Sequence, residues 1–232
     1  MTDSVDRPVV LVTGGSRGIG RAICQELAPD WHVLVGGRSA DSVAPVVDSL
    51  PSAEPFAADL LDADSTASAA SRVQHLDALV HSAGRDAVGA VGQASRDAWR
   101  TVFELNVIAI ADLTRLLLPL LRESHGDVIT INSGAGWRVG VGGGLYAASK
   151  FALRAFTDAL REEERGRVRV TSIHPGRVDT DMQRALQAHE GHEYRGSDYL
   201  RPASVAAAVR LALEATPEAM IESLSIRPVA RS

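Results

Sequence analysis

The stretch that decides the fold of this chain is Val9-Val10-Leu11-Val12-Thr13-Gly14-Gly15-Ser16-Arg17-Gly18-Ile19-Gly20. Its first part is a short apolar, β-branched run, which is typical of a strand buried in a parallel sheet. The glycines lead into a segment from Arg21 to Leu27 that we expect to be a helix. This order presents backbone N–H groups and the positive end of a helix to a phosphate, and glycines allow its close approach. The stretch therefore predicts the first, phosphate-binding unit of an α/β fold.

The same alternation of strand and helix continues along the chain. Alternating elements of this kind call for a parallel sheet covered by helices on both faces. At 232 residues the chain is long enough for one sizeable core. We therefore predict an α/β, doubly wound Rossmann fold with about seven parallel strands and residues 1–232 in a single domain. The expected strands are 8–13, 32–36, 54–58, 76–81, 127–132, 168–173 and 220–226, and the expected helices are 21–27, 40–50, 62–73, 95–123, 146–165 and 202–215.

Composition argues against several classes of function. The formal net charge is −5, which does not favour a nucleic-acid partner. Cys24 is the only cysteine, so no intrachain disulfide and no cysteine-based metal site can form. The segment 189–193 contains histidines and glutamates but not the His-Glu-x-x-His spacing, and we predict no metal site. There is no signal peptide and no apolar run long enough to span a membrane, so we expect a cytoplasmic protein without a membrane partner.

The segment Tyr146-Ala147-Ala148-Ser149-Lys150 carries a candidate acid–base pair. Tyr146 and Lys150 are four residues apart, so on a helix both side chains emerge on one face. A nearby cation favours the phenolate, and we therefore expect Lys150 to lower the pKa of Tyr146 from about 10. A phenol tuned in this way can act as a general acid or base. The alternative is an ordinary surface pair.

Ser133 is the second catalytic candidate. It follows the strand predicted at 127–132, and open α/β sheets bind their ligands at the carboxyl ends of such strands. A glycine-rich loop separates Ser133 from Tyr146, and it can fold back so that both hydroxyls face one carbonyl. Trp137, Arg138 and Val139 are the large side chains of this loop. Each is a candidate substrate contact, with a solvated loop residue as the alternative.

The spacing Thr13-Gly14-x-x-x-Gly18-x-Gly20, followed in order by Ser133, Tyr146 and Lys150, resembles the short-chain dehydrogenase/reductase family. The resemblance implies an enzyme that interconverts a ketone or aldehyde with an alcohol by hydride transfer. It assigns Tyr146 as the general acid/base, Ser133 as the group that stabilises the carbonyl oxygen, and Lys150 as the group that holds the nicotinamide ribose. Asn106 lies in an apolar helical run. It either satisfies neighbouring backbone groups or, as the resemblance implies, bends its helix and completes a proton path through water.

The resemblance also implies which residues bind the cofactor. One segment departs from the family, because His81-Ser82-Ala83-Gly84 replaces an Asn-Asn-Ala-Gly sequence, and His81 and Ser82 could supply substitute hydrogen bonds. The implied cofactor-binding residues are Gly14, Ser16, Arg17, Gly18, Ile19, Gly20, Arg38, Asp59, Leu60, Ser82, Ala83, Gly84, Tyr146, Lys150, Pro175, Gly176, Val178 and Thr180.

The end of the second strand predicts which nicotinamide cofactor is preferred. An acidic residue there would accept hydrogen bonds from a ribose 2′-hydroxyl and favour NAD(H), but Gly37 stands in that place. Arg38 follows it and Arg17 lies in the glycine turn, and two guanidinium groups suit a 2′-phosphate. We therefore expect NADP(H) rather than NAD(H). The alternative is that both arginines are solvated.

The substrate is expected to be a small carbonyl compound or alcohol. The segments Tyr199-Leu200-Arg201-Pro202 and Ser225-Ile226-Arg227-Pro228 resemble a subgroup that includes serine and 3-hydroxy acid dehydrogenases. Reduction of a 3-oxoacyl compound is an alternative. Arg138, Arg177 or Arg184 could pair with a substrate carboxylate.

Three further expectations concern regulation and assembly. The polar segment 181–200 has weak helical signals, and we interpret it as a mobile lid over the substrate. Proteins of this family assemble through two long helices, which implies a homotetramer or homodimer. A non-enzymatic alternative is an NADP(H)-binding redox sensor, although such a sensor need not keep Ser133, Tyr146 and Lys150 together.

Overall fold

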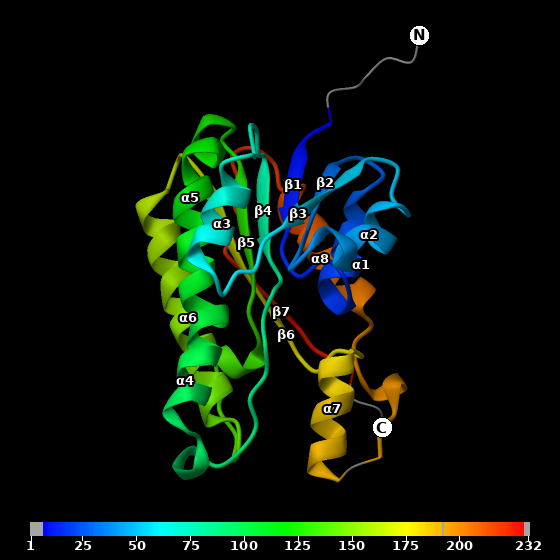
Figure 1. Cartoon of the computed structure of the whole chain (residues 1–232), viewed down its shortest axis with the longest axis vertical. Helices are drawn as coiled ribbons and strands as arrows, with labels where there is room; N and C mark the ends of the chain where they lie inside the picture. The colour runs from blue at the N-terminus through cyan, green and yellow to red at the C-terminus, as the bar shows by residue number, and fades with distance from the viewer. Residues whose placement is uncertain (1–6, 192, 230–232) are drawn as a thin grey trace.

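The protein is built on one sheet of seven parallel strands, in the order β3-β2-β1-β4-β5-β6-β7 (Figure 1). The computed structural model describes residues 7–191 and 193–229. This topology confirms the predicted doubly wound Rossmann fold. The strands are β1 (Val9–Val12), β2 (His32–Gly37), β3 (Ala53–Ala57), β4 (Ala78–His81), β5 (Asp127–Ile131), β6 (Arg169–Pro175) and β7 (Ser223–Ile226).

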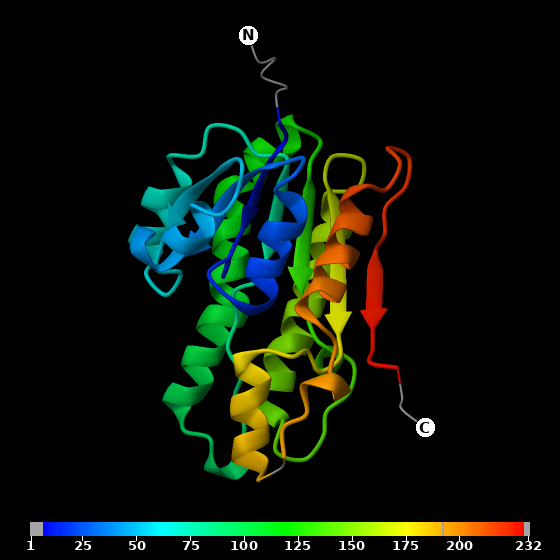
Figure 2. The ribbon, with the colours of Figure 1, turned by 90° about the vertical axis from the view of Figure 1, so that its right-hand side faces the viewer.

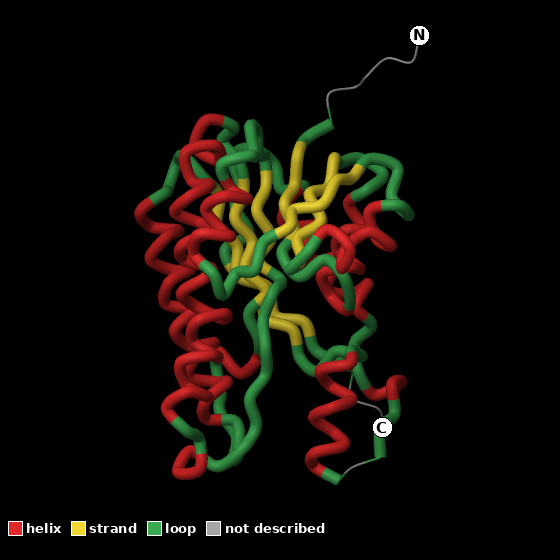
Figure 3. The backbone as a smooth tube through the Cα atoms, in the orientation of Figure 1, coloured by secondary structure: helices red, strands yellow, loops and turns green. Residues whose placement is uncertain are grey.

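Helices cover both faces of the sheet (Figure 3). Shorter helical turns connect some of them, at 91–93, 134–136 and 196–198. The α-helices are α1 (Gly18–Leu27), α2 (Ala40–Val47), α3 (Ala63–Ala70), α4 (Arg96–Phe103), α5 (Ala109–Glu123), α6 (Gly144–Glu163), α7 (Asp181–Glu190) and α8 (Pro202–Leu213).

Alternating side chains of each strand separate the core into two layers. In β1, Val10 and Val12 pack with α1, α2 and α8, whereas Leu11 packs with α3, α5 and α6. All three side chains are fully buried. The strands read as continuous apolar runs because both of their faces are covered, which is the pattern that predicted them.

Two predicted elements differ from the structure. The helix expected over 95–123 is interrupted by a π-helical turn at Glu104–Ile108, which joins α4 to α5 and contains the buried Asn106. A π-turn inserts one residue into the helical register, and apolar periodicity alone does not reveal it. The segment 181–200 was expected to have only weak helical signals. It contains the ten-residue helix α7, which is capped by the Thr180 hydroxyl accepting from Gln183 N at 3.3 Å.

The parallel arrangement brings the carboxyl ends of the strands to one edge, where the candidate site lies. Helices α4 and α7 extend beyond that edge (Figures 1 and 2). None of the helices in the described ranges combines the length and the apolar character that crossing a membrane requires.

Candidate active site

The residues expected to form the site converge at the carboxyl edge of the sheet. They follow six different strands in the sequence, and the parallel topology alone brings them together. The turn after β1 contributes Gly14, Ser16, Arg17, Gly18, Ile19 and Gly20. The segments after β2, β3, β4 and β5 contribute Arg38, then Asp59 and Leu60, then Ser82, Ala83 and Gly84, and then Ser133. The end of β6 contributes Pro175, and the segment after it contributes Gly176, Val178 and Thr180.

The glycine turn between β1 and α1 has the geometry of an anion site. Gly14 and Gly18 have φ of 68° and 56°, a region that favours glycine. A Cβ on Gly20 would collide with the carbonyl oxygen of Gly14, so no side chain fits there. Helix α1 begins at Gly18 and, among the described residues, no side chain caps its first turn. Its leading N–H groups therefore remain available to a bound phosphate.

Thr13 holds the residues that follow β4 against the glycine turn, and these two segments together form a cradle for a phosphate-bearing ligand. The sequence analysis did not assign this role to Thr13. Its hydroxyl accepts hydrogen bonds from the backbone N–H groups of Ser82 and Ala83, both at 3.0 Å. A Cβ on Gly14 would lie 2.9 Å from Ala83 Cα, so the two backbones are in close contact. The small residues after β4 are therefore held directly against the glycine turn.

His81 does not face this cradle. Its Nε2 lies 2.9 Å from the hydroxyl of Thr114 on α5, and the ring is 2% exposed. The Thr114 hydroxyl donates to Ile110 O, so His81 Nε2 is the donor. Burial lowers the pKa of His81 to about 3, which keeps the ring neutral. The Nε2 of His81 therefore bonds within the core, and a substitute hydrogen bond from this residue to the cofactor stays a prediction.

The segment after β2 has no room for an acidic side chain at Gly37. A Cβ there would collide with Val43 of α2 and approach Ser42 Oγ to 2.8 Å. Arg38 is exposed next to it. Arg17 is also exposed, and its Nη1 lies 3.6 Å from the carboxylate of Asp181 at the start of α7.

Ser133 is held in place by three contacts. Its backbone N–H donates to Asn132 Oδ1 at 2.9 Å, and its carbonyl accepts from His174 Nδ1 at 3.1 Å. Its hydroxyl oxygen accepts from Ala135 N at 3.1 Å, which leaves the hydroxyl proton free to be donated. Asn132 and His174 are buried positioning residues that the sequence analysis missed.

The Ser133 hydroxyl acts on the pKa of the Tyr146 phenol, so the two side chains lie together. Burial raises the pKa of Tyr146 to about 12, although the bond from Ser133 lowers it and the charge of Asp86 raises it further. The phenol is therefore protonated at neutral pH.

Lys150 does not lower the pKa of this phenol, which corrects the sequence-based expectation. Its Nζ donates to Ile131 O at 2.9 Å and lies 5.8 Å from the centroid of the Tyr146 ring. Lys150 is 5% exposed, and burial lowers its own pKa to about 8. The loss of solvent around both groups outweighs the attraction between ammonium and phenolate.

The segment after β6 returns to the glycine turn. A Cβ on Gly18 would lie 3.6 Å from Thr180 Cγ2, so these two predicted cofactor contacts are neighbours. The Thr180 hydroxyl also donates to Val178 O at 3.3 Å. Just before Thr180, the carboxylate Oδ1 of Asp179 accepts a hydrogen bond from Arg184 Nη2 at 2.8 Å. Arg184 is one of the arginines expected to meet a substrate carboxylate, and this bond already engages it.

The described side chains hold no group of three or more His, Cys, Asp or Glu arranged to bind a metal ion. His192, in the segment considered for such a site, lies outside the described residues.

Comparisons with known proteins agree with this arrangement. The family model for short chain dehydrogenases matches residues 8–191. Serine 3-dehydrogenase from Rhizobium radiobacter is 30% identical over 236 residues, covering 96% of this chain and 94% of that protein. An alcohol dehydrogenase from the archaeon Thermococcus sibiricus, complexed with 5-hydroxy-NADP, superposes with a TM-score of 0.88 at 26% identity, covering 98% of this chain and 99% of that one. A variant of actinorhodin polyketide ketoreductase with NADPH superposes with a TM-score of 0.89 at 25% identity, covering 96% and 97%.

Proposed function

The chain belongs to the short-chain dehydrogenase/reductase family of oxidoreductases, and on that premise we propose that it interconverts a ketone or aldehyde with an alcohol, using NADP(H). The observation that carries this proposal is the convergence of Ser133, Tyr146 and Lys150 at the edge of the sheet that also carries the uncapped start of α1. When bound, the nicotinamide cofactor supplies or accepts the hydride.

Tyr146 is the proton donor in the direction of reduction. Because the pKa of its phenol is about 12, the group carries its proton at neutral pH and can release it as charge develops on the substrate oxygen. Ser133 can donate its hydroxyl proton to the same oxygen when a substrate is bound, and it would stabilise that charge. Lys150, buried beside the phenol, is suited to hold the ribose hydroxyls.

Preference for NADP(H) is supported by three residues. Arg17 and Arg38 are exposed guanidinium groups flanking the adenosine end of the cradle, and an acid at the position of Gly37 would collide with α2. The two structural relatives described above were solved with 5-hydroxy-NADP and with NADPH. The glycine turn would hold the pyrophosphate, with Ser82, Ala83 and Gly84 on its other side.

Two elements extend the proposal beyond the chemical step. Helix α7 follows its capping residue Thr180, which lies next to the glycine turn, and is suited to close over a bound substrate as a lid. Helices α5 and α6 are the two long helices suited to assembly into a homodimer or homotetramer. Ile108, at the start of α5, and Phe151, on α6, are 51% and 36% exposed.

The relatives favour two substrate classes as alternatives. Similarity to serine 3-dehydrogenase favours a 3-hydroxy acid, and similarity to the polyketide ketoreductase favours a 3-oxoacyl compound. The redox-sensor alternative is disfavoured because a sensor need not keep Ser133, Tyr146 and Lys150 together.

Fluorescence titration with NADPH and NADH in parallel, followed by NADPH oxidation against ketones, aldehydes and 3-oxo acids, tests the proposal. Tyr146→Phe should keep NADPH binding and lose turnover by a factor of about 10² to 10⁴. Tighter binding of NADH would overturn the cofactor assignment, and NADPH binding without turnover on any substrate would favour the sensor.

A further inference from the structure

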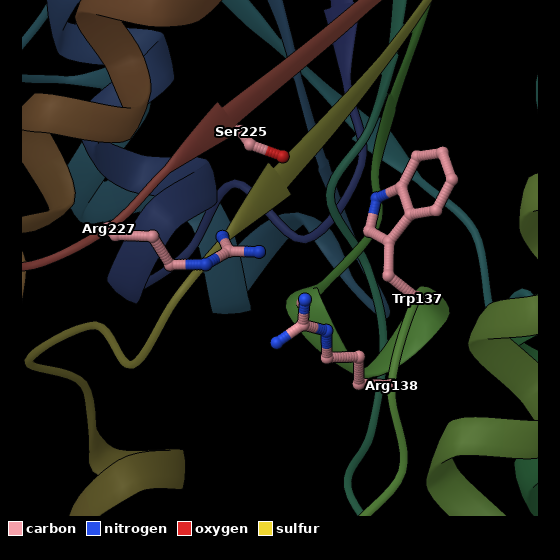
Figure 4. A pocket seen from close by; sticks show the side chains of 5 residues that line it. Trp137, Arg138, Ser225 and Arg227 are labelled. Atoms are coloured by element: carbon pink, nitrogen blue, oxygen red, sulfur yellow. The ribbon is translucent and has the colours of Figure 1, made fainter.

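A pocket of about 600 Å³ lies beside the turn that follows Ser133. It is lined by Gly134, Trp137 and Arg138 from that turn and by Ser225 and Arg227 from the end of β7. Figure 4 shows both guanidinium groups and the Ser225 hydroxyl turned toward one common space, with the Trp137 indole on the other side. None of these residues was assigned to the cofactor.

Arg227 is fixed by the backbone around it. Its Nη1 donates to His174 O at 2.5 Å and to Ile226 O at 2.9 Å. A Cβ on Gly134 would lie 3.1 Å from its Nη2, so the guanidinium rests against the backbone of the Ser133 turn. Within the described part of the chain, its Nε and Nη2 donate to no protein acceptor and remain available to a ligand.

Within residues 7–191 and 193–229, no ion pair balances the positive charge in this pocket. Among side chains that the structure describes, no carboxylate oxygen lies within 4.0 Å of the guanidinium of Arg138 or of Arg227. The whole chain has a formal net charge of −5, so the two cations are a local feature of an acidic protein. Two guanidinium groups facing one space repel one another, and an oxyanion between them removes that repulsion and is bound by their parallel N–H groups.

The remaining lining suits an organic ligand. Ile226 packs in the core, so its neighbours Ser225 and Arg227 point to the opposite side of the strand. The Trp137 ring lies 5.0 Å from the His174 ring and 4.2 Å from the Arg154 guanidinium, which fix the indole as an apolar wall. A hydroxyl and an aromatic face beside two cations fit an acid that carries a carbon chain.

We propose that this pocket binds the oxyanionic group, a carboxylate or phosphate, of a substrate whose carbonyl reacts at Ser133. The proposal rests on the proposed oxidoreductase function and adds the substrate class. Gly134 connects the two places, because it follows Ser133 directly and forms the floor against which Arg227 lies. Arg138 and Arg227 come from segments far apart in the sequence, so the subsite exists only in the folded protein.

Turnover of a matched substrate pair tests the subsite. For acetoacetate relative to methyl acetoacetate, the ratio of kcat/KM values should fall at least about tenfold in Arg138→Met and in Arg227→Met. Arg227→Lys keeps the charge and should restore part of the ratio. Arg72→Met, at an exposed position after α3, is the matched control and should leave the ratio unchanged. An unchanged ratio in both pocket variants would overturn the proposal.

A binding measurement separates this proposal from the proposed function, because it needs no turnover. Titration with acetoacetate, or with inorganic phosphate, should give a saturable change in tryptophan emission that Trp137→Phe abolishes and Trp99→Phe keeps. The ligand that gives the saturable change shows whether the pocket takes a carboxylate or a phosphate. The double variant Arg138→Met/Arg227→Met should lose the change. A change that persists in the double variant, or no change with either ligand, would overturn the assignment whether or not any substrate is turned over.

Discussion

The side-chain amide of Asn106 donates to the hydroxyl of Ser149 at 3.0 Å, and Ser149 in turn donates to the carbonyl of Tyr146 at 2.7 Å. Asn106 also accepts from Arg85 N and donates to Arg85 O, both at 2.9 Å. This fully buried amide therefore ties the π-turn, the segment after β4 and the first turn of α6 together. These contacts satisfy neighbouring backbone groups, and the π-turn interrupts the helix at Asn106. The proton path through water stays a prediction.

Loss of the Asn106 amide should cost both stability and activity. Asn106→Ala leaves two backbone groups of Arg85 unpaired in a partly buried site, and the free energy of unfolding should fall by about 2–3 kcal/mol. Ser149→Ala removes the link between Asn106 and Tyr146 but keeps both bonds to Arg85, so its stability loss should be smaller, about 1 kcal/mol, while kcat still falls. Urea unfolding and turnover of both variants check this, and equal stability losses would contradict it.

Lys150 should set the upper pH limit of reduction. Burial places its pKa near 8, whereas the pKa of Tyr146 near 12 is too high to affect turnover in that range. As pH rises through 8 the ammonium loses its charge, and kcat/KM for ketone reduction should fall. In Lys150→Arg the charge persists above pH 10, so the inflection near pH 8 should disappear. The same inflection in both proteins would assign it to another group.

His81 should make the wild-type protein sensitive to acid. Its pKa is about 3 in the folded protein and 6.5 in the unfolded chain, so below pH 6.5 the unfolded chain takes up a proton that the folded protein does not. The free energy of unfolding then falls by about 1.4 kcal/mol per pH unit from this residue. Between pH 7 and pH 5, wild type should lose about 2 kcal/mol more than His81→Asn in urea unfolding. Parallel pH dependence of the two proteins would be the contrary result.

Arg38 should distinguish the two nicotinamide cofactors. Its guanidinium is suited to a ribose 2′-phosphate that only NADPH carries, so Arg38→Ala should weaken NADPH binding about tenfold or more and leave NADH binding nearly unchanged. Arg21→Ala, at an exposed position on α1, is the matched control. Fluorescence titration measures both cofactors, and an equal loss for NADPH and NADH would show that Arg38 does not read the phosphate.

Local patterns were sufficient to predict most of the architecture. Buried parallel strands read as apolar runs, and glycines at Gly14, Gly18 and Gly20 are required by backbone geometry, so both signals are written in neighbouring residues. The four-residue spacing of Tyr146 and Lys150 likewise follows from helix geometry alone. Patterns of this kind do not show where a polar side chain finds its partner. His81 occupied the place of a cofactor contact in the sequence, yet it bonds to Thr114 in the core.

The sequence by itself determined the order of strands and helices, the glycine turn and the identity of the Ser133, Tyr146 and Lys150 constellation, because each depends on local spacing and on the general rule that parallel strands end at one edge. Only the tertiary structure decided the π-turn at Asn106, the opposite pKa shifts of Tyr146 and Lys150, and the meeting of Arg138 with Arg227. The physical reason is that these properties depend on loss of solvent and on contacts between segments distant in the chain, which no local pattern encodes.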